Sequence, residues 1–310
     1  MSNIIANQDV HQKYGGVVPE LASRAHLKNI IPVVDRAIAE ANIEKKDLDA
    51  IAYTRGPGLL GSLLVGSSFG KSLSLSLNIP LIEVNHMQAH LLAHFIDDNS
   101  ENKTNFPFLG VNISGGHTQI VLCKDYFKME IIGETLDDSI GEAYDKCGKM
   151  IGLSYPAGPK IDQFARKGNP TKFKFSIPKV SGLNFSFSGL KTNFKQFIED
   201  KSLNNKLFIN EERDNLCSSL QETITKILID KIIQASKNTG IKNIVFGGGV
   251  SANSRIRESA NRELKNFKLF FPKIEYTTDN AAMVAVVGYL KYREKKFADY
   301  GVESKARYKI

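Results

Sequence analysis

The order of apolar runs and glycine turns predicts an α/β fold made of two lobes. Short β-type runs alternate with helical patterns in the first hundred residues, a hairpin signal follows, and a strand, loop and helix unit begins near residue 243. We expect a first lobe at residues 1–105 and a second at 106–310, with an inserted basic helical segment in the second lobe. The C-terminal helix could return to the first lobe. Two such lobes would enclose a cleft.

The first lobe should alternate helix and strand. An apolar stripe predicts a helix over Val17–Ala41, with Pro19 suited to its first turn. The later elements are a strand at Asp49–Thr54, a helix of small residues ending near Asn78, a strand at Leu81–Val84 and a helix that carries histidines.

The second lobe should hold a hairpin and a second α/β unit. Phe106–Ser114 and Thr118–Lys124 flank a tight turn, and Ile131–Thr135 could add a strand. The remaining expected elements are helices at Ser139–Ile151, Gly158–Lys167, Ser188–Asp200 and Glu211–Lys237, strands at Asn243–Phe246 and Lys268–Phe271, and helices at Ser251–Phe267 and Asp279–Lys291.

Composition is that of a globular protein without a membrane span. Of the 310 residues, 42% are hydrophobic and 24% charged, and no apolar run approaches 18 residues. Met1–Val10 lacks the pattern of a secretory leader, and the three widely spaced cysteines form no metal or disulfide pattern, which favours a cytoplasmic location. The net charge of +8 suits a polyanionic partner, but it could equally reflect a general richness in lysine.

Three of the six histidines lie four residues apart between His86 and His94. On a helix, His86 and His90 would share one face and could aim two imidazoles at one metal ion. Two ligands alone do not make a site. A metallopeptidase is excluded, because Met87 stands where the zincin helix needs its glutamate.

Three glycine-rich turns could each approach a phosphate closely. They are Gly56–Gly61, Ser114–Thr118 and Gly247–Asn253. The first matches the dinucleotide fingerprint G-x-G-x-x-G, with Glu83 about twenty residues on. A nicotinamide-dependent oxidoreductase is therefore one alternative.

Seven motifs in order resemble the bacterial tRNA threonylcarbamoyladenosine transferases, the TsaD family. They are Asn85–His90, Ser114–Thr118, Gly141–Lys146, Tyr155–Pro159, Phe185–Lys191, Gly248–Asn253 and Thr278–Met283. The resemblance implies the actin-like fold, shared with Hsp70-like ATPases, with two α/β lobes around a nucleotide cleft.

The resemblance also implies a reaction and a set of site residues. The threonylcarbamoyl group would pass from threonylcarbamoyl-AMP to the exocyclic amine of adenosine 37 in tRNAs that read codons beginning with adenine. One divalent metal, Fe(II) with Zn as the alternative, would be held by His86, His90 and Asp279. For Asp279 the competing role is that of a helix N-cap. Substrate would be bound by Asn112, Ile113, Ser114, Gly115, Gly116, Asp145, Gly158, Asp162 and Asn253. No catalytic residue is assigned, although His117 is a candidate general base.

The expected partners are tRNA, a paralogous scaffold subunit and a small ATPase subunit. Residues 160–206 carry ten basic and three acidic side chains, interleaved with seven phenylalanines. The basic side chains could contact tRNA phosphates, as could those of residues 305–309, whereas we expect most of the phenylalanines to be core.

The sequence departs from the family pattern at its start. The resemblance begins at residues 3–6, without the strand and phosphate-binding turn that usually come first. We therefore expect a first lobe that lacks N-terminal strands, and a chain that is poorly active and unstable by itself. A non-catalytic complex subunit is a further alternative, although such a subunit needs no metal ligands.

Overall fold

A computed structural model describes residues 2–6, 16–96 and 104–310 of the chain, and it divides the chain into two compact units. Unit 1 is Met1–Glu101 with Thr278–Ile310, and unit 2 is Asn102–Thr277. The division after residue 101 lies near the expected one after 105. The second lobe was expected to run to residue 310, with a return of the C-terminal helix to the first lobe as the alternative. The segment from Thr278, which includes that helix, packs with unit 1. Half of the Met1–Val10 segment, residues 1 and 7–10, lies outside the described residues.

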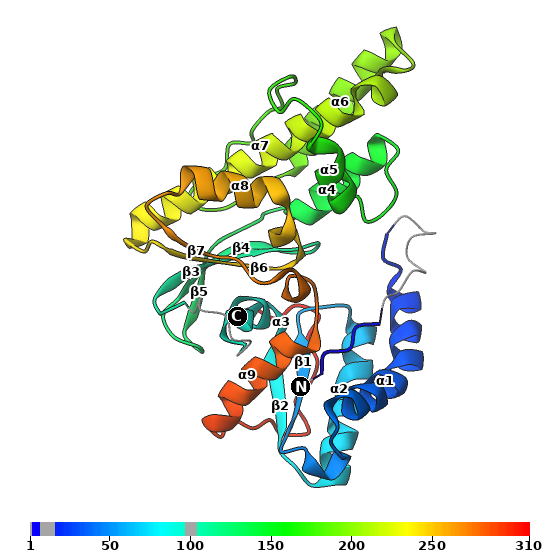
Figure 1. Cartoon of the computed structure of the whole chain (residues 1–310), viewed down its shortest axis with the longest axis vertical. Coiled ribbons are helices and arrows are strands. Elements are labelled where there is room, and N and C mark those ends of the chain that lie inside the picture. The colour runs from blue at the N-terminus through cyan, green and yellow to red at the C-terminus, as the bar shows by residue number, and fades with distance from the viewer. Residues whose placement is uncertain (1, 7–15, 97–103) are drawn as a thin grey trace. The chain divides into compact units, whose positions relative to one another are not determined.

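Unit 1 is a small parallel sheet with helices beside it (Figure 1). Strands β1 (Ile51–Gly56) and β2 (Leu81–Asn85) pair in parallel. Its helices are α1 (Pro19–Ala41), α2 (Leu60–Leu77), α3 (His86–Leu92) and α9 (Ala281–Arg293), with short 3-10 turns η2 (Lys45–Asp47) and η3 (Ala93–Phe95).

Local signals explain where the helices of unit 1 begin and end. Pro19 occupies the first turn of α1, as expected. Asn42 and Asn78 follow α1 and α2 in the left-handed conformation, which asparagine tolerates better than most residues. Gly70 of α2 lies against Tyr53 and Ile51 of β1, and a Cβ at this position would make only ordinary van der Waals contact with them.

Unit 2 contains a five-stranded mixed sheet in the order β5-β4-β3-β6-β7. The strands are β3 (Phe108–Ile113), β4 (Thr118–Cys123), β5 (Met129–Glu134), β6 (Asn243–Gly247) and β7 (Lys268–Phe270). The β3–β4 and β4–β5 pairs are antiparallel, and β6 joins β3 in parallel. The expected hairpin of β3 and β4 is therefore confirmed. On its other edge β3 pairs with β6, which comes more than 100 residues later in the chain.

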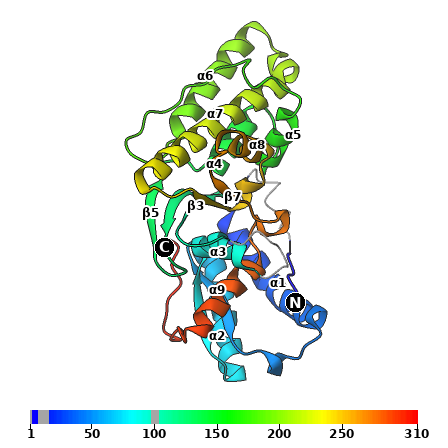
Figure 2. The ribbon, with the colours of Figure 1, turned by 60° about the vertical axis from the view of Figure 1, so that its left-hand side comes forward.

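Helices cover one face of this sheet (Figures 1 and 2). They are α4 (Ile140–Met150), α5 (Gly158–Ala165), α6 (Ser188–Asn204), α7 (Phe208–Thr239) and α8 (Ser254–Glu263). Two short 3-10 turns, η4 (Gly249–Ala252) and η5 (Ile274–Tyr276), complete the elements described in unit 2. The helix expected over Ser251–Phe267 is shorter than predicted. A 3-10 turn precedes it, and the side chain of Asn253 caps the helix by accepting from the Ile256 amide at 3.1 Å.

The phenylalanines of the basic segment belong to the core of unit 2, which confirms the expectation for them. Phe175, Phe185, Phe187 and Phe194 are buried, and Phe164, Phe173 and Phe197 pack against the same cluster. Their rings contact one another, for example Phe175 and Phe194 with centroids 5.1 Å apart. The four buried rings are therefore not available for stacking on bases.

None of the described helices is both long enough and apolar enough to cross a membrane.

Replacing Phe194 by Ala should lower the free energy of unfolding by about 3–5 kcal/mol, because a fully buried ring leaves a cavity. Chemical denaturation followed by circular dichroism measures this change. Leu203→Ala on the same helix is the control, since Leu203 is 84% exposed and its loss should change the stability by less than about 0.5 kcal/mol. Equal effects of the two substitutions would contradict the burial of Phe194.

Candidate metal centre

Helix α3 begins directly at the histidines because Asn85 caps it. The Asn85 side-chain oxygen accepts hydrogen bonds from the amides of Met87 at 2.9 Å and Gln88 at 3.1 Å. The cap fixes the first helical turn, so His86 and His90 lie one turn apart on one face, with ring centroids 4.7 Å apart.

Asp279 meets both imidazoles. Its Oδ1 atom lies 3.2 Å from Nε2 of His86 and 3.2 Å from Nε2 of His90. The three ligand atoms lie within 4.8 Å of one another, and among the described residues no other group of His, Cys, Asp and Glu comes together in this way. The residues that resemblance implied as metal ligands are thus adjacent, although nearly two hundred positions separate them.

Asp279 is not the cap of α9. The helix starts at Ala281, and Asn280 caps it by accepting from the Met283 amide at 2.9 Å. The alternative role for Asp279 is therefore wrong. Its carboxylate stays available beside the imidazoles, with 79% of the side chain exposed.

The residues present fit a divalent cation. His90 is 1% exposed, and neither of its ring nitrogens makes a hydrogen bond of acceptable geometry within the described chain. A buried polar nitrogen without such a bond is costly unless another partner satisfies it. Two imidazoles and one carboxylate are the donor set of Zn and of non-haem Fe(II) sites, and they leave coordination positions for substrate.

The electrostatics of the site favour neutral imidazole and ionised carboxylate. Desolvation lowers the pKa of His90 below its usual value, and the nearby Asp279 only partly opposes this. Desolvation would raise the pKa of Asp279, but the close approach of His86 and His90 holds that pKa well below the usual range. Solvent screens these interactions at the exposed carboxylate. These are the protonation states that bind a metal.

The residues expected to bind substrate lie in unit 2, around the first turns of three helices. The turn after β3 contacts the start of α4, because Gly141 donates to the Ser114 carbonyl at 3.2 Å and Ser139 Oγ donates to the Gly115 carbonyl at 2.6 Å. A Cβ at Gly141 would lie 2.6 Å from Gly115, so glycine is needed for this approach.

Three polar side chains of the expected set already hold this region together. Asp145 accepts from the Ala157 amide at 2.7 Å, next to Gly158 at the start of α5. Asp162 accepts from the amide and hydroxyl of Ser254, and Asn253 donates to Gln221 at 2.9 Å. Asn112 and Ile113 lie in β3 beside β6. His117 lies in the β3–β4 turn, where its amide donates to Ser114 Oγ at 3.1 Å.

Sequence reasoning left several contributors without a role. The role of Asn85 as a helix cap could be predicted from its place before the histidine run. Gln221 and Ser254 become partners of Asn253 and Asp162 only through tertiary contacts.

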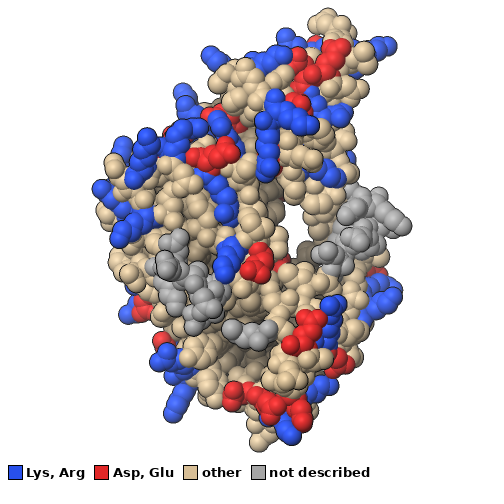
Figure 3. All heavy atoms as spheres, in the orientation of Figure 1, with Lys and Arg blue, Asp and Glu red and all other residues tan. Residues whose placement is uncertain are grey.

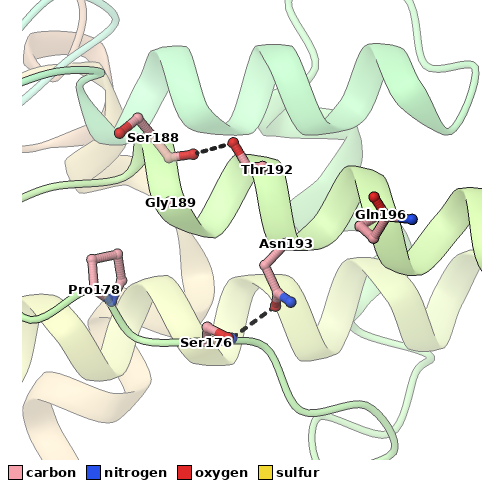
Figure 4. Close-up of a pocket in the computed structure, with 7 residues that line it drawn as sticks. All are labelled: Ser176, Pro178, Ser188, Gly189, Thr192, Asn193 and Gln196. Carbon is pink, nitrogen blue, oxygen red and sulfur yellow. Dashed lines mark hydrogen bonds between the residues drawn. The ribbon is translucent and has the colours of Figure 1, made fainter.

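A shallow depression beside α6 is a further feature (Figure 4). Its lining residues are all uncharged: Ser176, Pro178, Ser188, Gly189, Thr192, Asn193 and Gln196. Side chains without ionisable groups give it no evident acid, base or metal chemistry.

The dinucleotide interpretation of the first glycine turn loses its structural basis. A Cβ at Gly56 would lie 2.0 Å from the Lys305 carbonyl, the Gly58 amide donates to the Ala306 carbonyl at 3.1 Å, and Gly61 packs against Ser23. The chain itself fills the space that a pyrophosphate would need.

In the metal-free protein the pKa of His90 should lie below 6.5, because the ring is desolvated. Asp279→Asn should lower it further, since Asp279 is the group that opposes the shift. The folded state then binds fewer protons than the unfolded state, so the stability that His90 contributes is complete above about pH 6.5 and is lost as the pH falls below it.

Heteronuclear NMR of the imidazole nitrogens between pH 5 and 8 measures this pKa. Asp299→Asn is the control, because Asp299 is an exposed carboxylate of unit 1 that is not among the groups acting on His90. A pKa of His90 that rises in Asp279→Asn would contradict the assignment.

Comparison with known proteins identifies the family. The family model described as "TsaD: tRNA N6-adenosine threonylcarbamoyltransferase" matches residues 1–286. Curated relatives of that name include one from Christiangramia forsetii, 59% identical over 100% of this chain and 92% of the relative. Another, from Porphyromonas gingivalis, is 52% identical over 96% of this chain and 88% of the relative.

Solved structures show the fold. Two HypF structures cover 86% of this chain, one in a phosphate- and nucleotide-bound form with a TM-score of 0.61 and 15% identity over 42% of its length. The other, from T. kodakarensis, has a TM-score of 0.63 and 16% identity over 43% of its length. The architecture is thus the actin-like α/β fold that the motifs implied. On the family model and these relatives, the chain belongs to the TsaD family of tRNA N6-adenosine threonylcarbamoyltransferases and is a transferase.

Proposed function

We propose that the chain transfers the threonylcarbamoyl group of threonylcarbamoyl-AMP to the exocyclic amine of adenosine 37, in tRNAs that read codons beginning with adenine. The reaction depends on a divalent metal held by His86, His90 and Asp279. The observation that carries the proposal is the meeting of these three side chains, within 4.8 Å, in a chain of this family. We place the reaction in the cytoplasm, which suits three free and buried cysteines.

The metal is Fe(II), by resemblance to the family, with Zn as the alternative. Once bound, such an ion supplies Lewis-acid stabilisation of charge that develops on the carbonyl oxygen under attack. His86 and His90 would each supply one imidazole nitrogen to the ion, and Asp279 would supply a negative charge that offsets part of the ion's charge. The exposure of Asp279 leaves room on the solvent side for the substrate.

The adenylate part of the donor binds in unit 2. Its phosphate lies at the Asn112–Gly116 turn, where backbone amides and nearby helix N-termini favour an anion. Asp145 and Asp162 hold the starts of α5 and α8, so they shape the binding region, with Gly158 and Asn253 beside them. The residues orient the donor so that AMP can depart when the adenosine amine attacks. His117, in the same turn, remains the candidate general base.

The tRNA contacts the basic segment, residues 160–206. Lys174 and Lys179 lie there on an exposed and irregular stretch. On the face drawn in Figure 3, Lys and Arg are spread over unit 2 with acidic side chains between them, without a single continuous patch. Such a distribution suits phosphate contacts made by several separate lysines better than it suits binding in one basic groove.

A paralogous scaffold subunit packs on α1 and α2. These helices contact each other where Ser23 meets Gly61, and large apolar side chains near this contact are exposed. They are Leu27, Ile31, Leu60 and Leu64, each between 49% and 67% exposed. Exposed apolar side chains on adjacent helices favour a protein partner. A small ATPase subunit completes the proposed set of partners.

The two alternative functions have less support. The oxidoreductase is disfavoured because the protein's own chain fills the first glycine turn, and the non-catalytic subunit because the three metal-ligand side chains lie together.

His86→Ala should abolish metal retention and transfer together. Loss of one ligand of three leaves too few for a stable site, and about 3 kcal/mol or more of lost stabilisation slows transfer at least roughly hundredfold. Metal analysis of the purified protein and a transfer assay on unmodified tRNA measure the two effects separately.

His94→Ala is the matched control. His94 continues the same four-residue spacing but lies outside the triad, in η3, so its loss should spare metal content. Transfer at the normal rate by His86→Ala would end the proposal of metal dependence.

Lys174→Gln and Lys179→Gln should each weaken tRNA binding and flatten its salt dependence. If each substitution removes one phosphate contact, the slope of log affinity against log salt should decrease by about 0.7–0.9. Fluorescence anisotropy at several salt concentrations provides the slope. Lys295→Gln, at an exposed lysine of unit 1, should leave the slope unchanged. An identical slope in the unmodified chain and all three variants would contradict the proposal that this segment contacts tRNA.

A further inference from the structure

A segment at the C-terminal side of unit 1, residues 302–309, lies against the sheet and α2 and is called the strap below. The Lys305 amide donates to the Arg55 carbonyl at 2.9 Å, and the Ala306 carbonyl accepts from the Gly58 amide at 3.1 Å. Lys71 of α2 donates to the Val302 carbonyl at 2.7 Å. Backbone and side-chain bonds therefore attach the strap at several points along its length.

The side chain of Tyr308 joins the strap to both strands. Its hydroxyl lies 3.2 Å from Arg55 of β1, whose guanidinium also stacks on the ring with its carbon 4.7 Å from the centroid. The hydroxyl lies 3.2 Å from the Glu83 carboxylate of β2. Lys291 of α9 donates to the carbonyl and carboxylate of Glu83 at 2.7 and 3.2 Å. This network is partly buried, where hydrogen bonds to charged groups contribute more than they do in open solvent.

The strap ends at the cap of the histidine helix. The side-chain amide of Asn85 donates to the Lys309 carbonyl at 3.1 Å and lies 3.5 Å from the Tyr308 carbonyl. The oxygen of the same side chain receives the first amides of α3. One side chain, 6% exposed, thus connects the strap to the helical turn that carries His86. Figures 1 and 2 both show the C-terminus beside α3.

The same stretch of chain supplies the third ligand. Asp279 precedes α9, α9 packs against α3, and the strap follows α9. Both ends of the segment from residue 279 to residue 309 therefore contact the histidine helix or its side chains. The matched region of the family model ends at residue 286, before the strap.

We propose that the strap is a positioning element of the metal centre, which acts through Asn85 to hold the first turn of α3 so that His86 and His90 both face Asp279. This inference rests on the proposed metal site. Without the strap the cap oxygen remains, but the Asn85 side chain loses its second anchor. The first turn then samples more orientations, and metal binding must order it. Removing such supporting interactions lowers metal affinity by roughly 10- to 100-fold.

The test is Zn²⁺ affinity, measured by competition with a chromophoric chelator on the full chain. Asn85→Ser keeps a capping oxygen and removes the amide donor. Deletion of residues 309 and 310 instead removes the nearer acceptor, the Lys309 carbonyl, and keeps the Tyr308 side chain with its contacts to Arg55 and Glu83. Each change should weaken Zn²⁺ binding roughly tenfold, and the two together should weaken it no more than either alone, because both remove the same interaction.

Lys71→Met is the matched control, because it loosens the strap at residue 302 and leaves Asn85 untouched. Its Zn²⁺ affinity should stay within about twofold of the unmodified chain. Amide exchange over residues 86–92, measured without metal, should rise in Asn85→Ser and in the deletion but not in Lys71→Met. A general loss of stability would raise exchange in all three variants alike, and that result would overturn the positioning role.

The outcomes separate the two proposals. If the unmodified chain binds no Zn²⁺, or if His86→Ala binds it as well, the metal site itself fails and the positioning role fails with it. If the unmodified chain binds Zn²⁺ through His86 but the strap variants bind equally tightly, only the positioning role is overturned. Additive losses in the double variant would likewise overturn it, since the two changes would then act through separate interactions.

Discussion

The close approach of one carboxylate to two imidazoles is the contact on which the functional interpretation of unit 1 depends. Asp279 Oδ1 lies 3.2 Å from both histidine nitrogens, and this requires α3 and α9 to pack in one relative position. Two asparagines make that position possible. Asn85 starts α3 immediately before the first histidine, and Asn280 starts α9 immediately after the aspartate. Because each cap fixes where its helix begins, His86 and Asp279 both lie next to a helix start, and His90 follows one turn after His86.

The glycine turn at residues 56–61 shows how the same sequence pattern can serve a different physical purpose. Glycines are needed wherever another group approaches the backbone closely, and a pyrophosphate is only one such group. Here the approaching groups are the Lys305 carbonyl and Ser23. The turn accommodates the protein's own chain, so its match to a dinucleotide fingerprint carries no information about a cofactor.

Carboxylates organise unit 2 in a related way. Asp145 and Asp162 each accept backbone amides where a helix begins, and Asp137 accepts the amides of Phe187 and Ser188 at the start of α6. Hydrogen bonds from Ser186 and Ser188 outweigh desolvation and lower the pKa of Asp137. Negative charge at helix N-termini stabilises the helices and fixes where they begin. The contacts of these aspartates therefore support a structural role in shaping the region more directly than a role in contacting a ligand.

The sequence by itself determined the order and type of most elements, the hairpin, the core role of the phenylalanines and the family. These follow from local periodicity and from ordered motifs, both of which depend on residues that are neighbours in the sequence. It also suggested His86, His90 and Asp279 as a set, but only through resemblance. Tertiary structure decided that Asp279 reaches both rings, that Asn280 and not Asp279 caps α9, that residues from 278 onward pack with unit 1, and that the strap fills the first glycine turn. Each of these depends on contacts between residues far apart in the chain, and local patterns do not encode which distant segments will pack together.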